Sequence, residues 1–209
     1  MKLIVVTAPE FFVEEDKIIT EMFEGGLDLL HLRKPETAAM YSERLLTLIP
    51  SIYHRQIVTH EHFYLKDEFS LKGIHLNARN PSDPDEFDEP DSDYTGSVSI
   101  TCHNIDELRY RKKKYDYVFL CPVFDAITRI ELKSAFTPEV LRQAASEGLI
   151  DKNVMAFGGI TADNILEVKD YGFGGAVVMG DLWYRFNPCE DNNFKEIISY
   201  FYQLKKLVD

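Results

Sequence analysis

Eight short apolar segments recur along this 209-residue chain, and stretches with helical spacing of apolar residues separate most of them. Apolar runs without alternation are typical of strands buried on both faces, as in parallel sheets. Strands that alternate with helices form such sheets through right-handed crossovers. The expected strands are residues 2–7, 28–33, 56–60, 73–77, 96–101, 116–121, 153–157 and 174–179.

Eight such units in about 200 residues are the lower size limit of a TIM barrel. We therefore predict an α/β fold, a small (β/α)8 TIM barrel, as a single domain over residues 1–209. An open doubly wound sheet is the rival, but Thr7-Ala8-Pro9 stands where that fold carries Gly-x-Gly-x-x-Gly. Ser, Thr and Asn side chains cap helix starts. The expected helices are 14–24, 37–49 with Thr37 as N-cap, 104–113 opened by Asn104, Thr137-Pro138 to about Ser146, Thr161 to Tyr171, and 190–207.

The charge balance excludes several classes of partner. The chain has 35 acidic against 23 basic residues, a net charge of -12. Binding to nucleic acid or to an anionic membrane needs a basic face, so we expect neither. No segment reaches the roughly 18 apolar residues of a membrane span. Three cysteines without a Cys-x-x-Cys pair fit a reducing compartment, and we expect a cytoplasmic protein.

The segment 82–93 (SDPDEFDEPDSD) interrupts the alternation of strands and helices. It holds seven carboxylates and no basic residue. The calcium-binding loop pattern with its glycine and closing glutamate is absent. We interpret it as a solvated acidic loop after the fourth strand.

Two glycine turns give the sharpest indication of a binding site. In a TIM barrel the active site lies at the carboxyl ends of the strands. Gly158-Gly159-Ile160 follows the seventh expected strand, and Met179-Gly180 follows the eighth. Glycines let backbone N–H groups approach a phosphate, and a helix start favours negative charge. We predict that these turns bind a phosphate group.

Cationic and imidazole side chains follow other strands. Arg33 ends the second strand, and Arg129 lies in the long loop after the sixth, with Lys133 nearby. Arginine suits bidentate phosphate contacts. His31 and His60 lie at neighbouring strand ends, where imidazole suits general acid–base work.

The remaining histidines and the cysteines give weaker indications. His60-x-His62 lacks a third ligand that would complete a metal site, so we expect no metal from this pattern. His75 lies inside the fourth strand and is expected to pack in the core. Cys121 is expected to be a small buried thiol.

These segments together resemble the thiamin-phosphate synthase / TenI family over about residues 2–185. The resemblance rests on GGLDLLHLRK, GIHLNARNP, SVSITCHNIDEL, YDYVFLCPVFDAITR and AFGGITADNILEVKDYGFGGAVVMGDLW. It implies a (β/α)8 barrel in thiamin biosynthesis, usually a homodimer. The synthase joins a pyrimidine pyrophosphate to thiazole phosphate with Mg²⁺. The TenI branch converts a thiazole carboxylate phosphate to its aromatic tautomer by proton transfer, with no metal.

The sequence departs from the synthase pattern at several positions. The family's Gln-Leu-Arg is His31-Leu32-Arg33 here, and the following Lys falls on Pro35, with Lys34 adjacent. The two aspartates that the resemblance assigns to Mg²⁺ fall on His60 and Asn80. Imidazole and amide groups are poor ligands for this hard cation. Further departures are Thr101 for a serine, Ala126-Ile127-Thr128-Arg129 for Thr-x-Thr-Lys, and Pro122 for the TenI histidine.

We expect the chain to bind thiazole phosphate. Three functions follow, namely synthase-like coupling, TenI-like isomerisation, and binding without catalysis. Coupling would add the pyrimidine pyrophosphate as a substrate and Mg²⁺ as a cofactor; the other two need no cofactor. Another phosphate-binding barrel, such as a sugar-phosphate epimerase, is a further alternative. The catalytic candidates are His60, His31 and Arg33, and the substrate-binding candidates are Thr101, Thr128, Arg129, Gly158, Gly159, Ile160, Met179 and Gly180.

Overall fold

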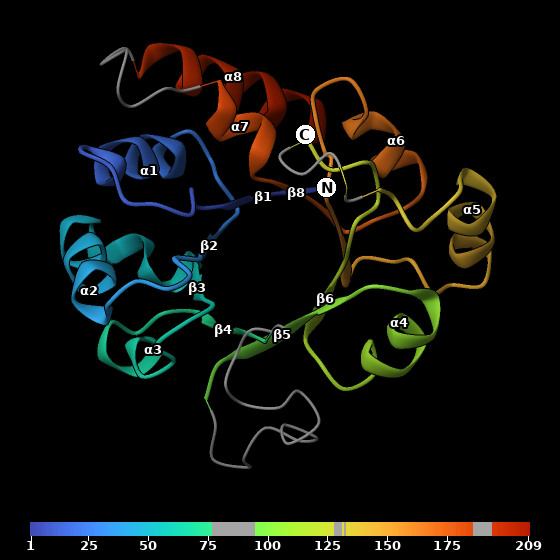
Figure 1. Ribbon diagram of the computed structural model, residues 1–209, viewed down its shortest axis with the longest axis horizontal. Coiled ribbons are helices and arrows are strands. Elements are labelled where there is room, and N and C mark those ends of the chain that lie inside the picture. Colours follow the sequence, from blue (N-terminus) through green and yellow to red (C-terminus); the bar gives the residue numbers. More distant parts are fainter. Residues whose placement is uncertain (77–94, 128–130, 132, 186–193) are drawn as a thin grey trace.

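Eight parallel strands form a closed barrel in the order β1 to β8, with β8 paired to β1 (Figure 1). This computed structural model describes residues 1–76, 95–127, 131, 133–185 and 194–209. The predicted TIM barrel is confirmed. The strands are β1 (Lys2–Val6), β2 (Leu29–Leu32), β3 (Ile57–Thr59), β4 (Gly73–Leu76), β5 (Ser97–Cys102), β6 (Tyr117–Leu120), β7 (Val154–Phe157) and β8 (Gly175–Val178).

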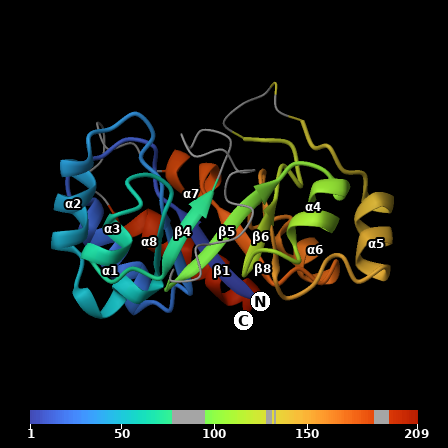
Figure 2. The same ribbon diagram turned by 90° about the horizontal axis from the view of Figure 1, so that it is seen from below.

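Helices surround the barrel, as Figure 1 shows. They are α1 (Glu15–Glu24), α2 (Ala39–Leu48), the 3₁₀ helix η1 (Ser51–Gln56), α3 (Leu65–Glu68), α4 (Ile105–Arg111), α5 (Pro138–Ser146), α6 (Ile165–Asp170), α7 (Gly180–Tyr184) and α8 (Lys195–Val208). The sequence did not predict η1, α3 or α7. Figure 2 shows both chain termini below the barrel, while β4 and β5 point upward.

Two predicted helix caps are confirmed and two are wrong. The side chains of Asn104 and Thr137 accept hydrogen bonds from the first turns of α4 and α5. Thr37 instead donates its hydroxyl to the Lys34 carbonyl, and α2 begins two residues later. Thr161 precedes a turn, and α6 begins only at Ile165, because Asn164 folds back to accept from the Thr161 N–H. The acidic segment 82–93 lies outside the described residues.

Two apolar layers stabilise the fold. The larger layer lies between the strands and the helices, and the smaller one fills the barrel interior. Successive side chains of a strand point to opposite faces, so His31 faces the interior together with Leu29. The interior layer consists of Ile4, Val6, Leu29, Val58, Tyr117, Phe119, Met155 and Val177. Polar side chains that share this interior are therefore removed from water.

No helix in the part of the chain that the structure describes is both long enough and apolar enough to cross a membrane.

Candidate functional site

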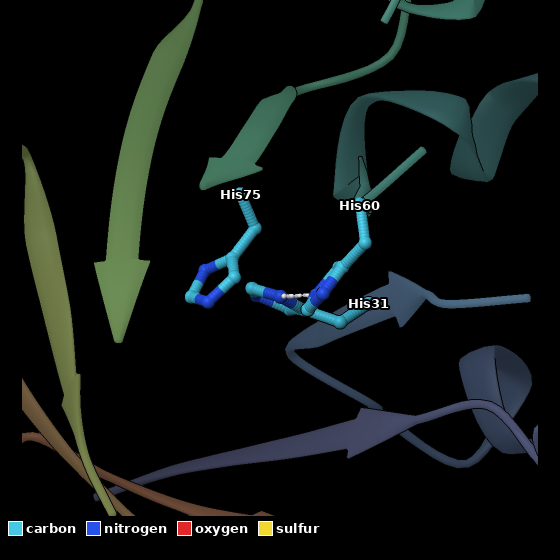
Figure 3. Close-up of side chains that lie close together, drawn as sticks. All are labelled: His31, His60 and His75. Atoms are coloured by element: carbon cyan, nitrogen blue, oxygen red, sulfur yellow. Dashed lines mark hydrogen bonds between the residues drawn. The ribbon is translucent and has the colours of Figure 1, made fainter. Parts of the chain in front are cut away.

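Three buried histidines from adjacent strands meet inside the barrel. His31 lies on β2, His60 directly follows β3, and His75 lies on β4 (Figure 3). One nitrogen from each ring lies within 4.8 Å of the others. His60 and His75 stack with their ring centres 4.3 Å apart. The predicted closeness of His31 and His60 is confirmed, whereas His75 is both a core residue and a member of this cluster.

A chain of hydrogen bonds runs through two of these histidines. The Tyr117 hydroxyl lies 2.9 Å from His31 Nε2, and His31 Nδ1 lies 2.9 Å from His60 Nε2. His60 Nδ1, at the end of this chain, is buried and has no hydrogen-bond partner among the described residues. Buried polar atoms are nearly always paired, so an unpaired nitrogen indicates a place for a ligand group or a water molecule.

His75 is held separately by two hydroxyl groups on β5. Its Nδ1 lies 2.8 Å from Ser99 Oγ, and its Nε2 lies 2.9 Å from Thr101 Oγ1. Phe119 packs against the His75 ring, with the ring centres 4.6 Å apart. Thr101, a candidate for substrate binding, therefore lies beside the cluster.

Burial keeps the three imidazoles uncharged. It lowers the pKa of His31 and His60 well below 6.5 and that of His75 to about 3. Neighbouring positive charge acts in the same direction, because Arg33 also lowers the pKa of His60 and His75. A neutral imidazole can donate through one nitrogen and accept through the other.

Of the two positions that the resemblance assigns to Mg²⁺, only His60 lies among the described residues. His60 offers an imidazole there, and the adjacent Thr59 hydroxyl donates to the Glu61 carbonyl. Magnesium prefers carboxylate and water oxygens. The second position, Asn80, lies outside the described residues.

A softer cation such as Zn²⁺ accepts imidazole, but the three rings are already engaged. Five of their six nitrogens have hydrogen-bond partners, and two rings stack. The arrangement therefore favours a hydrogen-bonded network over a metal centre.

The two cations after β2 have different surroundings. The Arg33 N–H donates to the Thr7 hydroxyl, which in turn donates to the Arg33 carbonyl. Lys34 is buried and donates to both Glu15 carboxylate oxygens at 2.6 and 2.8 Å. Lys34 therefore does not replace the family lysine at the barrel mouth.

The glycine turn after β7 is required by close backbone packing. Gly158 and Gly159 have φ values of +94° and +66°, a region that L side chains rarely adopt. A Cβ atom on Gly159 would lie 2.3 Å from the Asp125 carbonyl oxygen. Ile160 is buried just beyond them. This packing against the loop after β6 accounts for both glycines, and their binding of phosphate stays a prediction.

A buried tyrosine of α8 joins the turn after β7 to the start of α7. The Tyr200 hydroxyl accepts from the Ala162 N–H at 3.1 Å and donates to the buried Asp181 carboxylate. Met179 and Gly180 directly precede Asp181, so the two predicted phosphate turns are tied to one side chain. The sequence did not predict a role for Tyr200, because α8 is distant in sequence from the strand ends, nor for Asp181, which lies on the unpredicted helix α7.

The other candidates from the sequence are Cys121, Lys133, Thr128 and Arg129. Cys121 is half-buried rather than fully buried as expected, and its partial burial raises the pKa of the thiol to about 12. Lys133 pairs with Asp125. Thr128 and Arg129 lie outside the described residues.

Comparisons with known proteins agree with this architecture. The family model described as thiamine monophosphate synthase matches residues 3–182. The crystal structure of thiamine phosphate pyrophosphorylase from Bacteroides thetaiotaomicron is 62% identical, covers 100% of this chain and 98% of its own, and has a TM-score of 0.88.

More distant relatives carry the same names. The thiamine-phosphate synthase of Geobacillus thermodenitrificans is 25% identical over 171 residues, which are 78% of this chain and 76% of that protein. The thiamine phosphate pyrophosphorylase of Pyrococcus furiosus is 18% identical with a TM-score of 0.75, covers 99% of this chain and 95% of its own, and shows the shared fold.

Proposed function

The chain belongs to the thiamine monophosphate synthase family, and from that premise we propose that it binds a thiazole phosphate and shifts a proton on the thiazole. The reaction class is an isomerisation without a metal. The observation that carries this proposal is the buried Nδ1 of His60, which has no hydrogen-bond partner among the described residues and stands where the synthase resemblance assigns a magnesium carboxylate.

His60 has the properties that a proton-transfer residue needs. It is buried and neutral, and it shares a hydrogen bond with a second imidazole. A positioned acid–base group of this kind contributes about 10²- to 10⁴-fold to a rate. In an isomerisation one proton leaves the substrate and one returns at another atom, so the enzyme ends unchanged.

The substrate phosphate is assigned to the turns after β7 and β8. Gly158, Gly159 and Ile160 would face it from one side, and Met179 and Gly180 from the other. Tyr200 supports this assignment, because it fixes the two turns to each other. Arg33, Thr101, Thr128 and Arg129 are the proposed side-chain contacts to the substrate.

Synthase-like coupling is the second candidate. It is favoured by the 62% identity to a structure named thiamine phosphate pyrophosphorylase. Coupling requires release of pyrophosphate, whose developing charge needs strong stabilisation. An imidazole at the expected metal position argues against it.

Parallel assays of the purified protein distinguish these functions. The non-aromatic thiazole carboxylate phosphate is followed by NMR for conversion to the aromatic tautomer. A second reaction supplies thiazole phosphate and pyrimidine pyrophosphate, with and without Mg²⁺.

We expect tautomer conversion, lowered at least about 100-fold by His60→Asn, with phosphate-ligand affinity retained in calorimetry. Magnesium-dependent thiamin phosphate formation would instead support coupling. Tight binding without turnover in either reaction would support a thiazole-phosphate binding protein and overturn the isomerase.

A further inference from the structure

We propose that Tyr117 is a positioning residue that acts through His31 to fix which nitrogen of His60 carries the proton. Its consequence for turnover rests on the proposed isomerase, whereas its effect on the imidazole protons does not. Tyr117 opens β6, distant in sequence from both histidines.

The three groups are linked in sequence across the barrel interior. Tyr117 reaches from β6 to His31 on β2, and His31 reaches to His60 beyond β3, with 2.9 Å at each step. All three residues are buried. Phe119 packs against the His31 ring, with centres 4.7 Å apart, and limits its reorientation. The geometry of one link therefore determines the next.

Neutral imidazoles allow two proton arrangements along such a chain. In the first, Tyr117 donates to His31 Nε2, the His31 Nδ1–H donates to His60 Nε2, and the His60 proton lies on Nδ1. In the second, the His60 Nε2–H donates to His31 Nδ1, the His31 Nε2–H donates to the Tyr117 oxygen, and His60 Nδ1 carries no proton. A phenol O–H is a much stronger acid than a neutral imidazole N–H, so Tyr117 is the better donor at the first link. The first arrangement is the one we assign.

This arrangement makes His60 a neutral acid at its unpaired atom. Its Nδ1–H bond breaks as the proton moves to one atom of the thiazole. The same nitrogen then takes up the proton released when a bond to hydrogen breaks elsewhere on the substrate. One bond to hydrogen forms and one breaks on the substrate, no electrons are exchanged, and His60 returns to its starting form. The bond from His31 keeps the ring oriented throughout.

The test uses the intact protein labelled with ¹⁵N-histidine. Long-range ¹⁵N–¹H NMR spectra identify the protonated nitrogen of each ring. We compare wild type with Tyr117→Phe, which removes only the hydroxyl. Ser99→Ala is the matched control, because it removes another interior hydroxyl that is hydrogen-bonded to a histidine, His75, outside the chain.

In wild type we expect the protons of His31 and His60 on Nδ1. Tyr117→Phe is expected to give mixed tautomers in both rings, whereas Ser99→Ala leaves them unchanged. Turnover of the thiazole carboxylate phosphate by Tyr117→Phe is expected to fall about 10- to 100-fold in kcat, with KM within about twofold, since the substrate contacts are intact. Ser99→Ala should keep kcat within about twofold.

A wild-type His60 protonated on Nε2 would overturn the assignment. Unchanged tautomers together with unchanged kcat in Tyr117→Phe would also overturn it. If wild type converts no thiazole but the tautomers respond as expected, the isomerase fails while the role of Tyr117 in fixing His60 stands.

Discussion

The buried pair of Lys34 and Glu15 allows a quantitative test of how the loop after β2 is held. Both side chains are 1% exposed. The Lys34 ammonium also donates to the Glu10 carbonyl at 2.9 Å and lies 4.3 Å from the centre of the Phe11 ring. Lys34→Met preserves most of the side-chain volume but leaves the Glu15 carboxyl buried without its partner.

Removing one member of a buried ion pair costs about 3–5 kcal/mol, a large share of a typical total stability of about 5–15 kcal/mol. Replacing both members by apolar residues removes both desolvated charges. We therefore expect the free energy of unfolding at pH 8 to be about 3–5 kcal/mol lower for Lys34→Met than for wild type. For the double variant Lys34→Met/Glu15→Leu, we expect it to lie within about 1 kcal/mol of wild type. Urea unfolding followed by circular dichroism measures both. A single variant within about 1 kcal/mol of wild type, or a double variant as unstable as the single, would refute this reasoning.

The pH dependence of the same pair gives a second measure. Burial raises the pKa of Glu15 from 4.5 to about 7, despite the opposing attraction of Lys34. Because the folded protein holds this proton more tightly than the unfolded chain does, the stabilisation is complete below about pH 4.5 and is lost as pH rises toward 7. Wild type should therefore lose stability relative to the double variant between pH 5 and 7. If the difference in unfolding free energy between wild type and the double variant stays constant from pH 5 to 7, the pKa of Glu15 is not raised.

Three further predictions address the metal, the phosphate turns and the strained glycine. EDTA should leave thiazole isomerisation unchanged, and a loss that Mg²⁺ restores would show a metal role. Tyr200→Phe removes the hydroxyl that binds Asp181 and should weaken thiazole-phosphate binding about tenfold in calorimetry, equal to about 1.4 kcal/mol. Unchanged affinity would show that the turns after β7 and β8 do not form the phosphate site. Gly159→Ala should lower the free energy of unfolding in urea by more than about 2 kcal/mol, because its Cβ would meet the Asp125 carbonyl. The control Gly148→Ala, where φ is +70° and the space is open, should lower it by about 1 kcal/mol. Equal losses in the two variants would contradict the predicted clash.

The barrel could be predicted because its strands are nearly continuous apolar runs. Each of the eight predicted segments overlaps an observed strand, since burial on both faces leaves a signal that does not depend on distant residues. The starts of α2 and α6 could not be predicted as reliably. Thr37 and Thr161 have the right side chains for capping, but their hydrogen bonds are determined by the neighbouring loops. Local preference gives way to tertiary context at such positions.

Part of the candidate site could be predicted from the sequence. Strand ends brought His31 and His60 together as expected, because neighbouring parallel strands end at the same face of a barrel. Tyr117 was missed, since it begins its strand, and only the inward alternation of β6 brings it to His31. His75 was correctly interpreted as a core residue, but its contacts with Ser99 and Thr101 depend on the register between β4 and β5.

The distribution of charge around the cluster supports the proposed isomerisation over the release of a pyrophosphate. Of the two cations that follow β2, Arg33 lowers the pKa of His60 and His75, whereas Lys34 is paired with Glu15. Lys133 is likewise paired, with Asp125. Pyrophosphate departure builds negative charge that metal ions or several cations must balance. A proton shift on a bound thiazole creates no leaving group, and a neutral imidazole in a low-dielectric interior can both give and take the proton. Within the described residues, therefore, the charges present support the proposed isomerisation, in which the phosphate would be an anchor and the chemistry would take place at the ring.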